Sequence, residues 1–168
     1  MAIDPKVFRG ALGRFATGVT VVTVKDGAAA HGMTANAFAS VSLEPPLVLV
    51  CVDHRANSLE IIRRAKRFAV NFLAEEQKAL SDWFAGKGRD AADQFAGVPH
   101  GAGENGCPIL EGHIGALECG LHEDYPGGDH SIFVGRVTRV LLPEEVRAPL
   151  LFYASAYRKM NLGATFDS

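Results

Sequence analysis

The segment 31–53 constrains the fold most, because a run of small and polar residues leads directly into a strongly apolar strand pattern. Its short donors and acceptors stand among glycine and alanine, which would let a flat ring lie close to the backbone. The polar members are Thr34, Asn36, Ser40 and Ser42. Pro45 and Pro46 divide the segment, since proline cannot donate to a strand ladder. We expect strands near 38–43 and 46–53 that form a ligand cradle. A polar edge strand beside a buried one, without a ligand, is the alternative.

Two further elements are predicted before this segment. Asp4 is a suitable N-cap and Pro5 suits a first helical turn, and apolar residues then follow at helical spacing, which predicts a helix over 5–16. Those apolar residues are Val7, Phe8, Ala11, Leu12 and Phe15. The β-branched run 19–24 predicts a strand, and an Asp-Gly turn signal joins it to the strand that leads into the cradle.

A candidate anion site follows the cradle. Asn57 and Ser58 begin a short amphipathic helix, and Arg55 stands just before it. Unpaired N–H groups at a helix N-terminus attract anions, so a phosphate group could bind there. The alternative is that both residues only cap the helix. Beyond it, the patterns predict a buried strand over 68–73 and an amphipathic helix over 75–85. Its inward-facing residues should be Leu80, Trp83 and Phe84.

The second half of the chain is rich in strand patterns. Glycine, proline and charged residues fill 86–108, which is too long for a passive connection and predicts a functional lid or mobile segment. Period-two patterns then predict long strands over 114–125 and 132–142. The first should bury Leu117, Cys119 and Leu121 and expose Glu118, His122 and Asp124. The second should place Ile132, Val134 and Val140 on one side. Several antiparallel strands with few helices favour a small barrel.

Composition limits the classes of protein that remain. A chain of 168 residues with 48% hydrophobic residues predicts one globular domain spanning 1–168. The formal net charge of −2 gives no attraction for nucleic acid. No apolar run approaches the ~20 residues that a membrane span needs, and the N-terminus lacks the pattern of a secretory signal. We therefore expect a cytoplasmic protein that binds neither nucleic acid nor membrane.

Metal and dinucleotide motifs are missing from the sequence. Cys51, Cys107 and Cys119 have no zinc-like spacing, and their odd number favours free thiols in a reducing compartment. The six histidines form no HExxH motif, so no metal site is predicted. There is also no GxGxxG unit and no GxxxxGK[ST] loop. A nicotinamide cofactor would therefore have to bind without a Rossmann domain.

Segment 31–53 and four further stretches together resemble the flavin reductase-like family of short-chain NAD(P)H:flavin oxidoreductases. Those stretches are 15–23, 67–73, 128–130 and 149–158. Each is weak alone, but their order and spacing are specific, and the resemblance runs from Phe8 to Arg158. It implies a mainly β fold, a split β-barrel of the FMN-binding type with Greek-key connections and peripheral α-helices.

The resemblance also implies an activity. Hydride would pass from the nicotinamide C4 of NADH or NADPH to the N5 of FMN or FAD, and the reduced flavin would diffuse to a partner monooxygenase. The family places flavin at or near a two-fold interface, so a homodimer is expected, with the apolar run 150–153 offering surface. The alternatives are a non-catalytic flavin- or haem-binding protein on the same barrel, or a split-barrel oxidase.

Site residues follow from the same resemblance. His130 would contact the nicotinamide, with Asp129 orienting its ring; the alternative is that both are ordinary turn residues. The residues expected to bind flavin and to line its site are Thr34, Ala35, Asn36, Ser40, Val41, Ser42, Cys51, Asp53, Arg55, Asn57, Ser58, Phe95 and Tyr157. Many relatives have a basic residue before that phenylalanine. Gln94 stands here instead, which puts a charge contact from this point in doubt.

Overall fold

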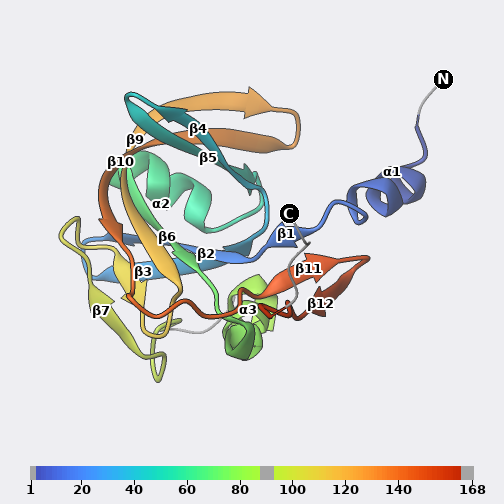
Figure 1. Ribbon diagram of the computed structural model, residues 1–168. Coiled ribbons are helices and arrows are strands. Elements are labelled where there is room, and N and C mark those ends of the chain that lie inside the picture. Colours follow the sequence, from blue (N-terminus) through green and yellow to red (C-terminus); the bar gives the residue numbers. More distant parts are fainter. Residues whose placement is uncertain (1–2, 88–92, 164–168) are drawn as a thin grey trace.

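The computed structural model describes residues 3–87 and 93–163, and its centre is a curved antiparallel sheet of seven strands (Figure 1). The strand order is β3-β2-β6-β9-β10-β5-β4. The strands are β2 (Thr20–Asp26), β3 (Ala29–Ala35), β4 (Phe38–Leu43), β5 (Pro46–Asp53), β6 (Arg67–Phe72), β9 (Gly115–Gly127) and β10 (His130–Leu141). The edge strands β3 and β4 are consecutive in the chain but do not pair with each other. The expected mainly β fold is confirmed, and the barrel is open between these two strands.

Smaller elements surround this sheet. β1 (Thr17–Gly18), β11 (Leu151–Tyr153) and β12 (Ala156–Arg158) form a three-stranded sheet, and β7 (His100–Ala102) pairs with β8 (Pro108–Leu110). The helices are α1 (Pro5–Leu12), α2 (Ser58–Ala65), the 3₁₀ turn η1 (Glu75–Gln77), α3 (Lys78–Asp82) and the π-helical turn η2 (Trp83–Lys87). No helix among the described residues is long and apolar enough to cross a membrane.

The two cradle strands begin and end where the sequence predicts. β5 alternates half-buried residues with Val48, Val50 and Val52, all of them buried. These valines meet Phe68 and Phe133 in the main core, which α2 covers through Leu59 and Ile62. A second core gathers Phe84, Phe95, Leu110 and Leu150 beside the first. Together these cores fix β3, β5 and α3 around one end of the barrel.

For two residues, the predicted side of the strand is wrong. Glu118 is 1% exposed, although alternation along β9 predicts it outside. Val140 is 61% exposed, although it should share a side with the buried Val134. The register shift between Val137 and Arg139 explains the second error, because Thr138 is an extra residue on β10 and moves the following residues of this strand to the other face.

The predicted helices are shorter or less regular than expected. α1 ends at Leu12 rather than at 16, and the 75–85 helix is divided into η1, α3 and η2. Phe84 is buried, and Leu80 and Trp83 are half-buried, so the predicted inward face is confirmed. In the long segment 86–108, residues 88–92 lie outside the described part. Of the rest, Gln94 and Phe95 are buried, whereas His100–Ala102 are exposed, and the functional lid or mobile segment remains a prediction.

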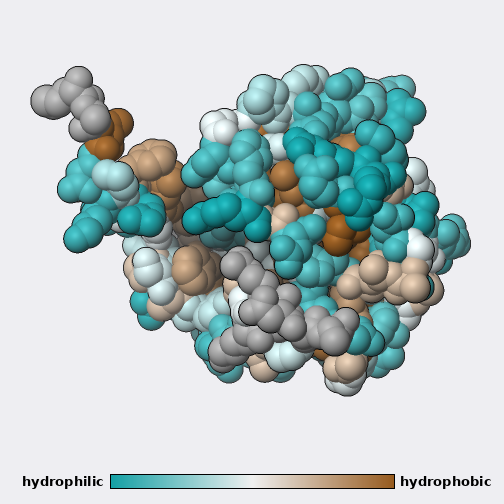
Figure 2. Space-filling view, turned by 180° about the vertical axis from the view of Figure 1, so that it is seen from behind, coloured by the Kyte–Doolittle hydropathy of each residue, from teal (hydrophilic) through white to brown (hydrophobic). Residues whose placement is uncertain are grey.

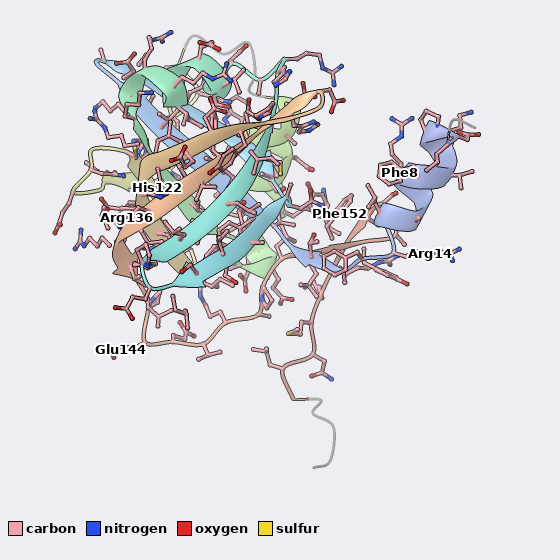
Figure 3. All side chains as sticks on the ribbon, turned by 90° about the horizontal axis from the view of Figure 1, so that it is seen from above. Phe8, Arg14, His122, Arg136, Glu144 and Phe152 are labelled. Atoms are coloured by element: carbon pink, nitrogen blue, oxygen red, sulfur yellow. The ribbon has the colours of Figure 1, made fainter. Side chains whose placement is uncertain are left out.

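Helix α1 stands apart from the barrel (Figures 1 and 2). Each of its larger apolar side chains is at least half exposed, and none of its residues is buried. The exposed fractions are 67% for Val7, 52% for Phe8 and 56% for Leu12. Figure 3 shows Phe8 on this projecting helix and Phe152 on the side of the body from which it leaves. The amphipathic pattern therefore has no apolar partner within the described chain.

Candidate active-site groove

A cavity of about 240 Å³ lies at the open end of the barrel, where β3 passes into β4 beside the end of β5. The predicted site residues that line it are Thr34, Ala35, Asn36, Cys51, Asp53 and His130. Five further residues complete the wall, namely Met33, Ala37, Ala56, Phe84 and Ala85. Residues nearly a hundred positions apart thus meet here, because β5 pairs with β10 so that Asp53 lies opposite His130.

This cavity continues into neighbouring ones through shared lining residues. Toward α2, Met33 and Ala56 are shared with a small hollow lined by Asn57 and Ser58. In the other direction, Thr34 and Asn36 are shared with a cavity of about 180 Å³ lined by Tyr157. Asn36 also borders a cavity of about 420 Å³ beneath β1. We call this run of cavities the groove. Its combined volume exceeds the lower end of the ~300–1,000 Å³ range that is typical of small-molecule sites.

Hydrogen bonds fix the wall of the groove on the α3 side. Thr34 Oγ1 donates to the carbonyl oxygen of Ser81 at 2.6 Å, and Ser81 Oγ and Tyr157 Oη are 2.8 Å apart. Lys78 Nζ lies 4.9 Å from the centroid of the Tyr157 ring. The hydroxyl proton of Thr34 is therefore already used, and only its acceptor lone pairs and backbone remain for a ligand.

Asp53 and Arg55 form a paired charge at the mouth of the groove. Arg55 Nη2 donates to Asp53 Oδ2 at 2.6 Å, and Arg55 Nε and its backbone N–H donate to Asp53 Oδ1 at 3.0 and 2.8 Å. These hydrogen bonds from Arg55 hold the pKa of the Asp53 carboxyl well below its usual range. The carboxylate is thus ionised at neutral pH, and the side chain of Arg55 is 85% exposed beside it.

His130 is oriented by its neighbour. Its Nδ1 lies 2.7 Å from Asp129 Oδ1, and a carboxylate only accepts, so Nδ1 carries the proton. This hydrogen bond lowers the pKa of the Asp129 carboxyl. The backbone N–H of His54 donates to the Asp129 carbonyl at 3.0 Å and ties the turn to the end of β5. Nε2 of His130 has no recorded partner among the described residues, which leaves it available to a ligand.

At the candidate phosphate end of the groove, the side chains of Asn57 and Ser58 are not equally available to a ligand. Asn57 is exposed and its side chain makes no capping hydrogen bond to α2. Ser58 is 1% exposed, and its hydroxyl is 2.9 Å from the sulfur of Met33. Of this pair, only Asn57 presents an uncommitted side chain to a phosphate, while the buried Ser58 hydroxyl already has a partner.

Five predicted flavin-site residues lie outside the groove lining, and Arg55 at its mouth is one of them. Ser40, Val41 and Ser42 are on the edge strand β4, where a bulge between Ser40 and Ser42 interrupts pairing with β5. Phe95 is 5% exposed and packs on Phe84, with ring centroids 5.2 Å apart. Phe84 itself lines the groove, so Phe95 supports the wall from behind.

Gln94, which puts the charge contact implied by the resemblance in doubt, has a structural role. Its Oε1 accepts from the backbone N–H of Gly32 at 2.9 Å, and the side chain is buried. Trp83 Nε1 also donates to the Gln94 carbonyl at 2.9 Å. These bonds hold the described end of the 86–108 segment against β3, and no charge from this position reaches the groove.

Sequence reasoning missed the apolar lining of the groove. Phe84 is predicted as a core residue by helical spacing, and spacing alone does not separate a core face from a cavity wall. Ala56 and Ala85 carry no chemical signal of their own. Their small side chains nevertheless keep the floor open, and burial at this floor raises the pKa of the Cys51 thiol. The groove thus has space for a flat ring, with polar groups at either end.

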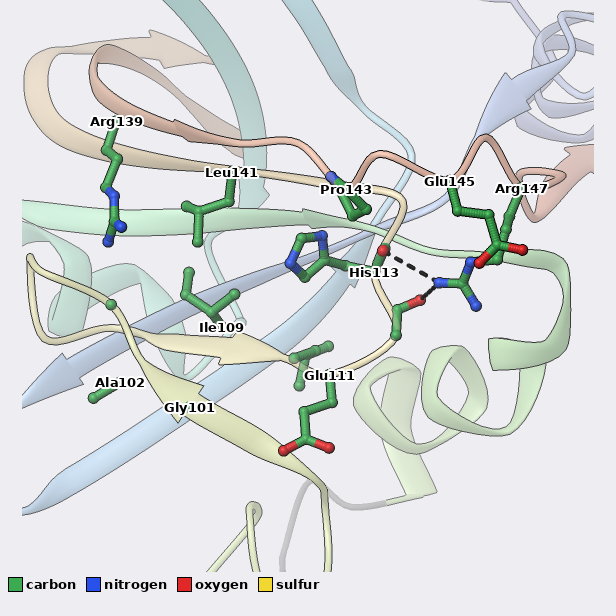
Figure 4. A pocket seen from close by; sticks show the side chains of 13 residues that line it. Gly101, Ala102, Ile109, Glu111, His113, Arg139, Leu141, Pro143, Glu145 and Arg147 are labelled. Carbon is green, nitrogen blue, oxygen red and sulfur yellow. Dashed lines mark hydrogen bonds between the residues drawn. The ribbon is translucent and has the colours of Figure 1, made fainter.

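A second cavity, of about 580 Å³, lies between the β7–β8 hairpin and the ends of β9 and β10 (Figure 4). Arg147 Nη2 donates there to the carbonyl oxygens of Gly112 and His113. The Nδ1 atom of His113 is buried without a recorded partner in the described chain. Burial, together with the charge of Arg147, lowers the pKa of His113. This cavity shares no lining residue with the groove.

The fold is an open antiparallel barrel, and the groove at its split edge suits a flat ring. These two features place the protein in the class of split barrels with a site for a flat ring. The model of the flavin reductase like domain matches residues 12–161, and the chain belongs to this family.

Three relatives illustrate the likeness. A protein named probable flavin reductase from Rhizobium meliloti (strain 1021) is 47% identical over 80% of this chain, which spans only 43% of that relative's length. The reductase component of 4-hydroxyphenylacetate 3-monooxygenase from Thermus thermophilus is 43% identical, covering 92% of this chain and 96% of its own. The structure of the NADH:FAD oxidoreductase SgcE6 from Streptomyces globisporus C-1027, in complex with NAD and FAD fragments, has a TM-score of 0.89. It is 40% identical, over 98% of this chain and 99% of that one.

Proposed function

We propose that the protein is an NAD(P)H:flavin oxidoreductase that reduces FMN or FAD and releases the reduced flavin to a partner monooxygenase. The observation that carries this proposal is the presence of His130 in the same cavity as Thr34, Asn36 and Cys51. The named activities of the SgcE6 and Thermus thermophilus proteins support it. A cytoplasmic location fits this role.

Each end of the groove has a separate task in this proposal. When both cofactors are bound, they supply the hydride chemistry themselves, between nicotinamide C4 and flavin N5. Ala35, Ala37 and Ala56 leave room for the flavin ring, while Asn36 offers hydrogen-bonding groups beside it. Asn57 and Arg55 face the flavin phosphate. The contribution of the protein is to position the reactants and to exclude water, because no proton has to be abstracted by a side chain.

His130 and Tyr157 form the nicotinamide side. The bond from Nδ1 to Asp129 places a proton on Nδ1, so that in the neutral ring Nε2 is an acceptor toward the nicotinamide carboxamide. Tyr157 is held by Ser81 and gives the opposite wall of the groove its shape. Ser40, Val41 and Ser42 have a place in this proposal only if the flavin extends along the exposed edge of β4.

The experiment that tests the proposal follows NADH and NADPH oxidation with and without added FMN or FAD. We expect oxidation that depends on added flavin and binding of flavin at micromolar concentrations. Flavin binding without NAD(P)H oxidation would favour a non-catalytic carrier. Oxidation of a small organic substrate in its place would favour an oxidase. An apoprotein that binds no flavin would contradict all three.

We also propose a homodimer in which the exposed apolar face of α1 packs against a second copy. The run 150–153 offers less surface than the sequence indicates, since Leu150 is 2% exposed and belongs to the second core. Val7, Phe8 and Leu12 instead present apolar area that water would otherwise cover. Sedimentation of the protein and of a Phe8→Asp/Leu12→Asp variant tests this. A wild-type monomer with full activity would contradict it.

A further inference from the structure

A negative charge stands beside the only arginine that the proposed function assigns to the flavin phosphate. The Asp53 carboxylate lines the groove and accepts two hydrogen bonds from the Arg55 guanidinium, from Nη2 at 2.6 Å and from Nε at 3.0 Å. A third bond, from the Arg55 backbone N–H to Asp53 Oδ1, holds the carboxylate in place independently of the arginine side chain. A phosphate that approaches Arg55 therefore meets a fixed carboxylate that is already paired with it.

We infer that Asp53 is a specificity-determining residue that lowers the affinity of the groove for the phosphomonoester of FMN relative to FAD and riboflavin. This inference rests on the proposed function, which brings flavin into the groove. It concerns how the charge at the groove mouth affects the relative binding affinities of flavins that share the same ring.

Charge explains the direction of the effect. A phosphomonoester carries about −1.5 to −2 charges near pH 7, whereas each phosphate of the FAD diphosphate carries one, and riboflavin has none. Repulsion by a fixed carboxylate grows with the charge of the approaching group. The same carboxylate also offsets the attraction of Arg55, because its bidentate geometry is the one that a phosphate would need. FMN therefore loses most from the presence of Asp53, FAD less, and riboflavin nothing.

No other acidic residue in the described lining of the groove duplicates this role. The charge of Asp129 also acts on Arg55, but its side chain is 88% exposed and is bonded to His130 rather than to Arg55. Asp53, by contrast, is part of the cavity wall and lies opposite His130 in the β5–β10 ladder.

The test measures dissociation constants of riboflavin, FMN and FAD by fluorescence quenching for the wild type and for Asp53→Asn. Asparagine keeps the size and an acceptor for the Arg55 backbone N–H but removes the charge. We expect about two- to fivefold tighter FMN binding, in the range of exposed charge pairs. FAD should tighten less, and riboflavin should not change. Asp26→Asn is the matched control, since Asp26 pairs with Arg64 at 3.0 Å outside the groove.

The outcomes separate the inference from the proposed function. Unchanged FMN affinity in Asp53→Asn, or equally tighter binding of all three flavins, would overturn the inference. Riboflavin binding by the same proteins would still support the proposed function. Arg55→Gln should weaken FMN binding most, FAD binding less and riboflavin binding not at all, and in the double variant Asp53→Asn/Arg55→Gln the gain for FMN should be smaller. A wild-type protein that binds none of the three flavins would instead contradict the proposed function.

Discussion

The two large depressions in this molecule differ in how their polar groups are used. The second cavity is larger than any single cavity of the groove, but the charged side chains around it hold neighbouring loops: Arg147 bonds backbone carbonyls, and Arg139 bridges Glu104 and Glu118. In the groove, His130 is oriented by Asp129 and keeps Nε2 without a recorded partner in the described chain. A cavity becomes a candidate site when its groups are fixed and still have bonding capacity, whatever its volume.

The largest effect should come from the polar support beside the second cavity. Glu118 is buried and accepts from the backbone N–H groups of Glu104 and Asn105, at 3.1 and 2.6 Å. Glu118→Ala leaves these two donors without their acceptor and Arg139 with Glu104 alone, which should cost about 2–4 kcal/mol of stability. Urea denaturation measures this, with Glu118→Gln as the milder control. Flavin affinity of the folded fraction should not change. A loss of flavin binding without loss of stability would show that the two regions are coupled.

The next largest effect distinguishes an enzyme from a non-catalytic flavin carrier. His130→Ala should raise the KM for NAD(P)H or slow flavin reduction by about two- to tenfold, since a lost hydrogen bond contributes ~0.5–1.5 kcal/mol. Flavin affinity should stay within about threefold, because the imidazole contacts the nicotinamide in our proposal. Anaerobic stopped-flow reduction measures the first quantity and fluorescence quenching the second. Reduction at an unchanged rate at every NAD(P)H concentration would return His130 to the role of a turn residue.

The contrast between the regions also explains what could be read from the sequence. The cradle strands are predicted to the residue, because alternation along β5 and the Pro45-Pro46 break are local signals. Glu118 is misplaced because β9 packs its outer face under the 103–106 turn, a contact between distant segments. The role of Gln94 also depends on such a contact, with Gly32. The pattern of α1 shows that one face is apolar, but a helical period does not say which molecule covers it.

A smaller effect tests whether the groove wall is held by hydrogen bonds or only by packing. Tyr157→Phe removes the bond to Ser81 Oγ but keeps the ring under Lys78 and against Phe152. We expect the KM for NAD(P)H to rise by about two- to fivefold, the equivalent of ~0.5–1 kcal/mol. Ser81→Ala should have a similar effect, and the double variant should add little to either. Additive effects in this cycle would mean that the two hydroxyls act separately.

The smallest expected effect concerns pH and the second cavity. Burial and Arg147 lower the pKa of His113 from its ordinary value of 6.5, so the unfolded chain binds a proton at a higher pH than the folded protein does. Stability is therefore lost as pH falls through 6.5 toward the lowered pKa, because protons bind preferentially to the unfolded state. His113→Gln should reduce the drop in urea midpoint between about pH 8 and about pH 5.5. Part of the drop should persist, since burial lowers the pKa of His31 as well. An identical pH dependence in the variant would mean that His113 takes up its proton in the folded state, and that its unpartnered nitrogen has the bonding capacity that we ascribe only to the groove.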